Sequence, residues 1–347
     1  MKIVTYSKNT LFIKCGLISL MLFALCKTSY GSCSIPSPFA SSTWHDSRHG
    51  SIVFSATSVS GIFVDYDIYG TIDNWDCHVT TFLTDGRILL RSQNNVTILF
   101  QPWSTYICLS LTEIQPSVSY AYYHLNHKES NALDSRVYSA VASTTVDMST
   151  ACDAVNGASG SEFAVLIKSG QEASSYIECP KPLLGRFDFT YTDAGGTTYC
   201  NDPSADPPLH MNVCSDKKQV QFDVACSQTP VYAPASVYCV YSKDIGGDTY
   251  VQLYNPGAVD NSATYRFSCM AISSDSTSAT IVYRNCTGEM TSSVAAVNKT
   301  GNQIGSVISF TPYVFCHKVK SLLILVSNIL NSKDIVQIYS ESRDLII

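Results

Sequence analysis

The sequence predicts an all-β protein made of two disulfide-bonded antiparallel β modules in tandem, each a sandwich or a barrel. Three observations lead to this fold class. Short β-branched and aromatic runs alternate with turn residues, and helical periodicity is nearly absent. Twelve of the 14 cysteines follow an N-terminal export signal. Two similar cysteine–proline segments each introduce a strand-rich region.

Residues 1–31 have the pattern of a secretory signal peptide. Three lysines precede an apolar run at 15–26, and Ser29 and Gly31 are the small residues expected before a cleavage point. The apolar run is shorter than the ~20 residues of a membrane-spanning helix. We therefore expect a secreted, extracellular protein without a stable membrane span.

The charge that remains after cleavage excludes nucleic acid as a partner. Removing four lysines with the signal leaves 18 basic and 28 acidic residues, a net charge of −10. Binding to phosphates needs clustered Lys and Arg, and the sequence has no such cluster.

The cysteines of the exported chain predict a disulfide framework, because their number is even. No C-x-x-C occurs, which excludes zinc ribbons and thioredoxin-like sites, and no cofactor or metal is expected. The pairing stays open at this point. The predicted disulfide cysteines are Cys33, Cys77, Cys108, Cys152, Cys179, Cys200, Cys214, Cys226, Cys239, Cys269, Cys286 and Cys316.

Two entrance segments, 33–44 and 179–191, divide the chain. Each begins with cysteine, contains two prolines and leads through a small residue and an aromatic into a strand. The expected organisation is a signal peptide (1–31), a first cysteine-containing β module (32–170), a second cysteine-rich β module (179–316) and a C-terminal tail (317–347).

The strands are expected from period-2 and apolar runs bounded by turn residues. Asp85-Gly86 predicts a tight hairpin turn, residues 148–160 a loop, and 163–167 the buried strand that closes the first module. The expected strands of the first module are 51–57, 59–69, 77–84, 87–91, 96–100 and 106–111, with 163–167. Those of the second are 187–192, 219–225, 236–241, 249–254, 264–270 and 280–284.

Three N-x-S/T sequons predict glycosylation at Asn95, Asn285 and Asn298. Asn285 is the least favoured, because its neighbour Cys286 is expected in a disulfide. Glycans at these positions would mark surface loops.

Candidate metal ligands are few. His45 and His49 are four apart, but they lie in a turn entering a strand, so we interpret them as surface-loop residues. His124 and His127 are likewise expected to be exposed. Residues 65–76 place acidic side chains like an EF-hand loop, yet both flanks predict strands and position five is a tyrosine.

No catalytic residues are predicted, and we expect no enzyme. The sequence has neither a G-x-S-x-G nucleophile elbow nor a phosphate-binding glycine loop. Paired carboxylates for glycoside hydrolysis stay possible, since their separation depends on the fold.

The cysteine, tryptophan and glycine spacing resembles a group of uncharacterised, cysteine-rich extracellular modules, domains of unknown function that occur in tandem in secreted and single-pass membrane proteins of invertebrate animals. The likeness covers most of 33–286 and implies no activity or binding residue. It rests on Cys33…Pro36…Trp44…Ser47…Gly50, Trp75-Asp-Cys77, Tyr106-Ile-Cys108 and Cys179-Pro…Gly185-Arg-Phe187.

A second, shorter likeness is to lipocalins. Ser42-Thr-Trp44 and Gly185-Arg-Phe187 are similar to the G-x-W segment that begins the lipocalin barrel. This resemblance implies an up-and-down barrel with a ligand cavity.

Taken together, these features predict a non-catalytic extracellular binding or structural glycoprotein whose partner is an unknown extracellular protein or glycan. A lipocalin-like carrier of a small apolar ligand is the alternative, and it predicts a closed apolar cavity. A secreted hydrolase is the third hypothesis, and it predicts titratable groups clustered in a cleft.

Overall fold

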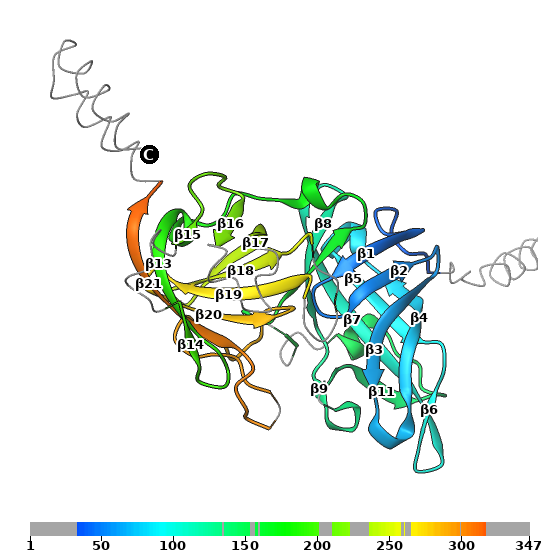
Figure 1. The fold of residues 1–347 in the computed structure, drawn as a ribbon. Helices are drawn as coiled ribbons and strands as arrows, with labels where there is room; N and C mark the ends of the chain where they lie inside the picture. The colour runs from blue at the N-terminus through cyan, green and yellow to red at the C-terminus, as the bar shows by residue number, and fades with distance from the viewer. Residues whose placement is uncertain are drawn as a thin grey trace, which may run out of the picture.

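A computed structural model describes residues 33–133, 135–152, 157–158, 160–200, 210–222, 236–257, 260, 265–298 and 300–316. The predicted signal peptide, Cys226 and the predicted C-terminal tail lie outside these residues. In the described part, the chain forms two eight-stranded antiparallel barrels in tandem (Figure 1). The predicted all-β fold is confirmed, and both modules are barrels, not sandwiches.

The first barrel is an up-and-down meander in which neighbours in sequence are neighbours in the sheet. Its last strand, β12, pairs with both β8 and β1, so the sheet closes on itself. The barrel strands are β1 (Ser42–Asp46), β2 (Gly50–Phe54), β3 (Ser58–Asp65), β4 (Thr71–Thr80), β5 (Arg87–Ser92), β7 (Gln101–Gln115), β8 (Ser119–His124) and β12 (Ala164–Lys168).

Shorter elements decorate this barrel. Strands β6 (Val96–Ile98) and β11 (Tyr138–Val141) both pair with β7, and β9 (Lys128–Glu129) pairs with β10 (Ser135–Arg136). The helical turns are η1 (Asp67–Tyr69), α2 (Phe82–Asp85), η2 (Ser130–Ala132), α3 (Met148–Ala151) and η3 (Glu172–Ser175).

The second barrel repeats the meander. Strand β21 pairs with β13 along its whole length and closes the barrel. The sequence predicted neither β15 nor β21. The strands are β13 (Gly185–Thr192), β15 (His210–Asn212), β16 (Gln219–Phe222), β17 (Ser236–Ile245), β18 (Asp248–Tyr254), β19 (Phe267–Ser273), β20 (Ser278–Tyr283) and β21 (Ser306–Phe315), with η4 (Lys181–Leu183) before β13 and β14 (Thr198–Tyr199) beside it.

The first strand of each barrel carries a fully buried aromatic side chain, Trp44 or Phe187. Because side chains alternate along a strand, each aromatic points inward with the residues two positions away. Trp44 lies opposite Lys168 of the closing strand, and Phe187 lies opposite Pro312. The two predicted entrance segments therefore introduce equivalent strands.

The disulfides also repeat. Cys33 and Cys179, each in the segment before the first strand, bond Cys77 and Cys239 on the fourth strand of their barrels. Two further bonds join the sixth strand to the connection between the seventh and eighth strands. These are Cys108–Cys152 in the first barrel and Cys269–Cys286 in the second.

The second barrel has more disulfides than the first. Cys214 after β15 bonds Cys316 after β21, which bridges the two neighbours of β13. Cys200 is also disulfide-bonded. Each described disulfide joins two cysteines of the same barrel.

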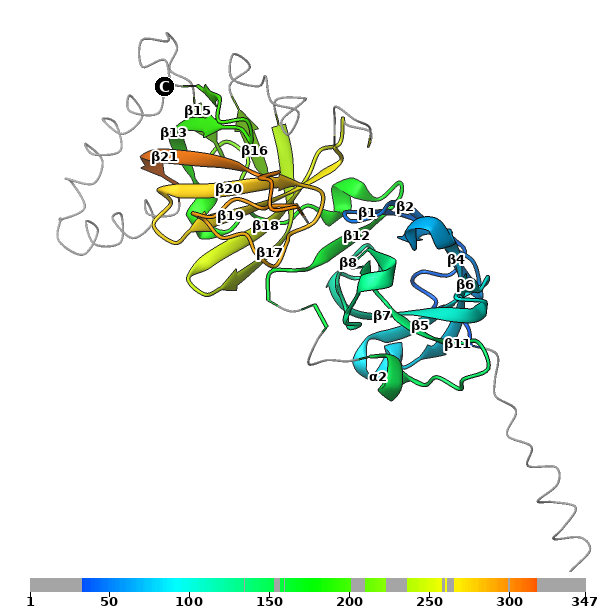
Figure 2. The same ribbon diagram turned by 90° about the horizontal axis from the view of Figure 1, so that it is seen from below.

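Strand β12 lies at the junction of the barrels (Figure 2). Its inward residues Ala164 and Leu166 join the core of the first barrel, whereas Val165 and Ile167 pack on the second barrel. This explains why residues 163–167 form a continuous apolar run instead of an alternating one. Side chains such as Val240, Tyr254 and Phe267 complete the shared apolar cluster.

Polar contacts surround this junction. Glu172 accepts a hydrogen bond from His45 at 2.9 Å, and Arg266 of the second barrel contacts the same imidazole. Lys243 donates to the Tyr123 hydroxyl at 2.6 Å. An apolar centre with a polar rim is the arrangement of a specific interface, so the barrels form one unit.

Candidate ligand-binding site

The N-terminal segment lies along the outside of the first barrel and turns into its end. The Cys33–Cys77 disulfide holds its beginning, and the backbone N–H of Ile35 donates to the carbonyl of Ala56 at 2.8 Å. A turn at Pro36 then brings Phe39 over the end of the barrel, because its N–H and that of Ala40 both donate to the Pro36 carbonyl.

Phe39 fills the barrel end with aromatic packing. Its ring lies 5.0 Å from Trp44, 4.7 Å from Tyr120 and 5.5 Å from Phe82, measured between ring centroids. Phe39 and Trp44 are fully buried. Aromatic pairs at these distances add to the stabilisation from burial alone. The interior at this end is therefore occupied by side chains.

The connection between β4 and β5 differs from the predicted hairpin turn. The strands do pair, but the one-turn helix α2 joins them, and Gly86 ends it in the left-handed conformation with φ of 74°. A Cβ at Gly86 would collide with the carbonyl oxygen of Leu111. Asp85-Gly86 therefore ends a helical turn instead of forming the predicted hairpin turn.

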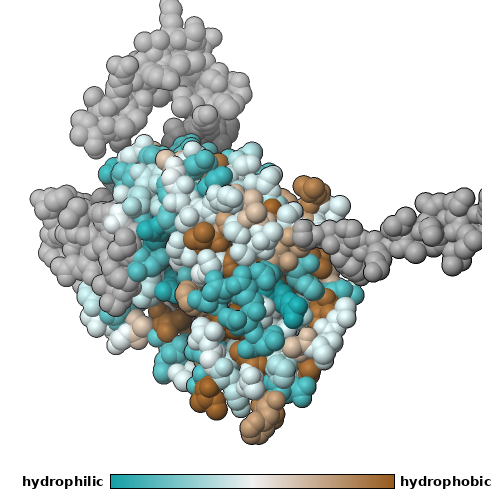
Figure 3. Space-filling model, turned by 90° about the vertical axis from the view of Figure 1, so that its right-hand side faces the viewer, coloured by the Kyte–Doolittle hydropathy of each residue, from teal (hydrophilic) through white to brown (hydrophobic). Residues whose placement is uncertain are grey.

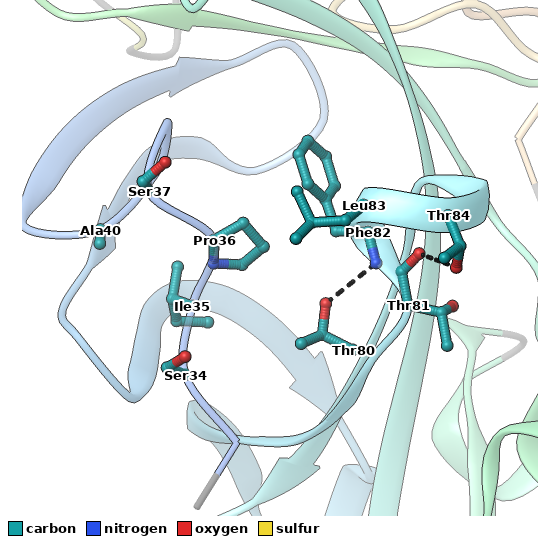
Figure 4. A pocket seen from close by; sticks show the side chains of 10 residues that line it. All are labelled: Ser34, Ile35, Pro36, Ser37, Ala40, Thr80, Thr81, Phe82, Leu83 and Thr84. Atoms are coloured by element: carbon teal, nitrogen blue, oxygen red, sulfur yellow. Dashed lines mark hydrogen bonds between the residues drawn. The ribbon is translucent and has the colours of Figure 1, made fainter.

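A cavity of about 670 Å³ separates α2 from the N-terminal segment (Figure 4). It is open on one side, so it differs from the closed cavity that the carrier hypothesis predicts. Pro36 of the N-terminal segment faces Phe82 and Leu83 of α2 across it. None of the lining residues is charged: they are Ser34, Ile35, Pro36, Ser37, Ala40, Thr80, Thr81, Phe82, Leu83 and Thr84.

Some hydroxyl groups of the lining form hydrogen bonds with the backbone of α2 and the residues beside it. Thr80 accepts from the N–H of Phe82 at 3.2 Å, and Thr84 donates to the carbonyl of Thr81 at 2.9 Å. These bonds hold α2 in place. The cavity therefore combines apolar side chains with several hydroxyl groups and suits an uncharged, mainly apolar molecule.

A second cavity of about 360 Å³ lies on the other side of Phe82. Tyr120 donates to Glu113 at 2.7 Å there. Hydrogen bonds from the Ser117 N–H and from Tyr120 lower the pKa of Glu113. Phe82 is the side chain that separates the two cavities, and both are lined by residues of the first barrel.

Further along β1 and β8, the interior becomes polar. Asp46, almost fully buried, accepts from Tyr122 at 2.7 Å and from the backbone N–H groups of Arg48 and His49. The rings of His49 and His124 lie 5.9 Å apart. The Nε2 atoms of both histidines are buried without a hydrogen-bond partner.

Burial dominates the electrostatics of this cluster, here named the Asp46 cluster (Asp46, His49, Tyr122, His124). It raises the pKa of Asp46 to about 6 against the opposing hydrogen bonds from Tyr122 and the backbone. Burial and the Arg48 charge lower the pKa of His49 to about 3, and burial lowers that of His124 well below 6.5. The histidines are neutral at pH 7.

The Asp46 cluster bears on the hydrolase hypothesis, which predicts titratable groups in a cleft. The groups do cluster with shifted pKa values, but Asp46 and His124 are 1% and 4% exposed. A substrate from solvent does not meet them in this conformation.

Two sequence-based interpretations of the histidines were wrong. His45 lies in β1 against the second barrel, not in a loop. His49 lies in the turn before β2, as expected, but its ring points into the Asp46 cluster and not to the surface. His124 is buried, although the sequence analysis expected it to be exposed. His127 is half-buried, with 39% of its side chain accessible to solvent.

Two of the predicted sequons present exposed asparagines, Asn95 and Asn298. The side-chain N–H₂ of Asn285 instead donates to the carbonyl of Cys286 at 2.8 Å. The EF-hand-like segment 65–76 forms the tip of the β3–β4 hairpin with η1. Among the described residues, no three His, Cys, Asp or Glu side chains are placed to hold a metal ion.

The sequence did not predict the cavity residues of α2, because residues 77–84 have the pattern of a single strand. The Gly86 that ends α2 was the available signal. In the part of the chain that is described, no helix has the length and apolar character needed to cross a bilayer.

Residues 176–299 match the Domain of unknown function (DUF7042). The match spans less than half of the chain and covers the second barrel from before Cys179 through β20. It supports the second part of the resemblance drawn from the sequence. No curated protein and no solved structure matches the chain.

Proposed function

We propose that this protein is a non-catalytic extracellular binding protein whose first barrel takes a small, uncharged, mainly apolar molecule. The cavity between α2 and the N-terminal segment carries the proposal, since its lining combines an apolar floor with hydroxyl groups and lacks charge. The five described disulfides are consistent with an extracellular location.

The barrel architecture supports this proposal over a purely structural role. Closed eight-stranded meanders are rigid frames that hold a small ligand in several protein classes, lipocalins among them. Here the barrel interior is filled, so the ligand would sit at the barrel end instead of in its centre. The lining has serine and threonine hydroxyls but no His, Asp, Glu, Lys or Cys side chain that could act as a base for them, which favours binding over catalysis.

Native mass spectrometry of the mature protein, secreted from eukaryotic cells, tests for a resident ligand. We expect a small-molecule mass that disappears on denaturation. Where the site is empty after purification, the neutral apolar dye Nile red serves as the probe, and its fluorescence should rise and saturate.

A cavity-filling variant assigns the binding to this site. Thr84→Trp adds a large side chain at an exposed lining residue, and we expect at least a tenfold weaker affinity for Nile red. Thr311→Trp makes the same change at an exposed position of the second barrel and should bind normally. Equal binding by both variants would exclude the cavity as the site.

A further inference from the structure

The turn between β6 and β7 has an unusual sequence for its backbone. Ile98 pairs with Gln101, so Leu99 and Phe100 alone form the turn. Both have positive φ, 50° and 66°. Two-residue hairpin turns with two positive φ values strongly favour Asn-Gly, because large side chains are strained there. Leu-Phe is thus unfavourable for the turn itself.

Neither side chain is compensated by packing. Leu99 is 81% exposed and Phe100 is 100% exposed. A second loop, η1, contacts β6 and carries Ile68, which is 82% exposed. Both loops lie at the lower end of the first barrel (Figure 1), where Figure 3 shows hydrophobic residues projecting from the surface.

The hairpin that carries this tip is held firmly on the barrel. Ser104 of β7 donates to the side chain of Asn95 at 2.8 Å, and Arg91 of β5 donates to Ser104 at 3.0 Å. The apolar side chains are therefore presented by a fixed base. A fixed presentation lowers the ordering cost of any contact that they make.

We propose that Ile68, Leu99 and Phe100 form a tip that inserts into the interfacial region of a neutral lipid surface. Fully exposed side chains on a convex tip need a partner that closes around them. A bilayer interface does this without a preformed pocket, whereas a protein partner must supply a matching groove. This peripheral contact is independent of the proposed ligand cavity.

Charge selects the kind of lipid. Asp65 and Asp67 flank the tip, and residues 94–103 contain no Lys or Arg. Protein surfaces that bind anionic lipids carry clustered basic residues, and an anionic lipid surface repels carboxylates. The tip therefore suits zwitterionic lipid, such as a phosphatidylcholine surface, and should lose affinity as anionic lipid is added.

Flotation of the mature protein with phosphatidylcholine vesicles tests the proposal. We expect the protein to float with the vesicles, and Leu99→Asn/Phe100→Gly to reduce the bound fraction at least about tenfold. Asn-Gly is the pair that this type of turn favours, so the variant should keep the circular dichroism spectrum and the thermal midpoint of the original protein. Val294→Asn, at an exposed apolar residue of the second barrel, should bind like the original protein.

Three results would overturn the lipid assignment. The protein could fail to float, it could bind equally with the Asn-Gly turn, or it could require anionic lipid. Binding to a purified protein that depends on Leu99 and Phe100, without any vesicle binding, would assign the tip to a protein partner instead.

Discussion

The two barrels have the same frame and different interiors. Both are eight-stranded meanders with a buried aromatic on the first strand and two disulfides at equivalent places. The first barrel encloses the titratable Asp46 cluster. Among the described residues of the second barrel, the buried polar side chains are uncharged, such as Ser306, whose hydroxyl lies 2.8 Å from that of Tyr191. The frame therefore does not determine what the interior contains.

The barrels also differ in the connection between the fourth and fifth strands. In the first barrel, α2 forms this connection and walls the 670 Å³ cavity. In the second, Gly246 and Gly247 make a two-residue turn, and Ile245 pairs directly with Asp248. The candidate ligand site is thus an addition to a repeated frame, which explains why it is found at the end of the first barrel.

The largest expected effect concerns a disulfide of the second barrel that has no counterpart in the first. All four cysteines of the first barrel are used in its two bonds, so Cys214–Cys316 has no counterpart there. Its closed segment of 102 residues is the longest of the described disulfides. Replacing both cysteines by serine should destabilise the second barrel by about 4–5 kcal/mol, because a long loop regains its entropy in the unfolded chain.

Urea unfolding separates the barrels in this test. All three tryptophans belong to the first barrel, so tryptophan fluorescence follows its unfolding and circular dichroism follows both. We expect the circular dichroism transition of the second barrel to shift and the fluorescence transition to change little. A loss below about 1 kcal/mol would show that native pairing along β13 already closes the barrel.

The sequence predicted the frame well because strand runs and cysteine counts are local signals. It missed β21, whose run of ten residues contains Pro312, a residue that usually argues against a central strand. The structure accommodates this proline at a register shift between Arg186 and Phe187. It missed β15 because three residues carry no periodic signal.

The candidate site was harder to predict, because its residues gain their roles from distant contacts. His124 has a usable signal, since Tyr120, Tyr122 and His124 alternate on one face of β8 and therefore share its burial. Nothing local links His124 to His49, however, and the cavity joins segments about forty-five residues apart. Only the closure of the barrel brings His49 next to His124 and the N-terminal segment next to α2.

The second expected effect is a difference in acid sensitivity between the barrels. In unfolded chain, His49 and His124 bind protons below pH 6.5, whereas burial keeps them neutral in the folded state. Asp46 has the opposite effect: its folded pKa of about 6 lies above the ordinary 3.8, so between these values the folded state binds a proton that the unfolded state does not. Between about pH 6 and 4 these three groups together give the unfolded state a net one proton more, and their combined contribution to the stability of the first barrel should fall by about 1.4 kcal/mol per pH unit on acidification.

Asp46→Asn sharpens this prediction. Without the opposing carboxyl, the two histidines give the unfolded state two extra protons, and the contribution of the cluster to the loss should rise to about 2.7 kcal/mol per pH unit. Urea titrations at pH 6, 5 and 4, followed by tryptophan fluorescence, measure the slope. A slope that stays the same in Asp46→Asn would show that this carboxyl does not gain a proton in the folded barrel.

The next effect comes from the small residue that precedes each buried aromatic. In the second barrel this residue is Gly185, where a Cβ would lie 2.6 Å from the ring of Phe187 and 2.8 Å from the Val314 carbonyl oxygen. Gly185→Ala should therefore destabilise the second barrel by about 2 kcal/mol through overpacking. Circular dichroism in urea measures the shift, and an unchanged midpoint would mean that β21 can move aside.

The smallest effect is expected at the equivalent residue of the first barrel, Ser42. Its hydroxyl accepts the indole N–H of Trp44 at 2.8 Å and donates to the carbonyl of Phe39. Ser42→Ala removes both bonds without adding volume, so the buried indole N–H is left unpaired at a cost of about 1 kcal/mol. Ser42→Gly should cost about 0.5–1 kcal/mol more, because glycine also frees the unfolded backbone. Tryptophan fluorescence during urea unfolding measures both losses. If Ser42→Gly were instead as stable as the original protein, the hydroxyl would be dispensable, and the two barrels would tolerate the same residue before their buried aromatics.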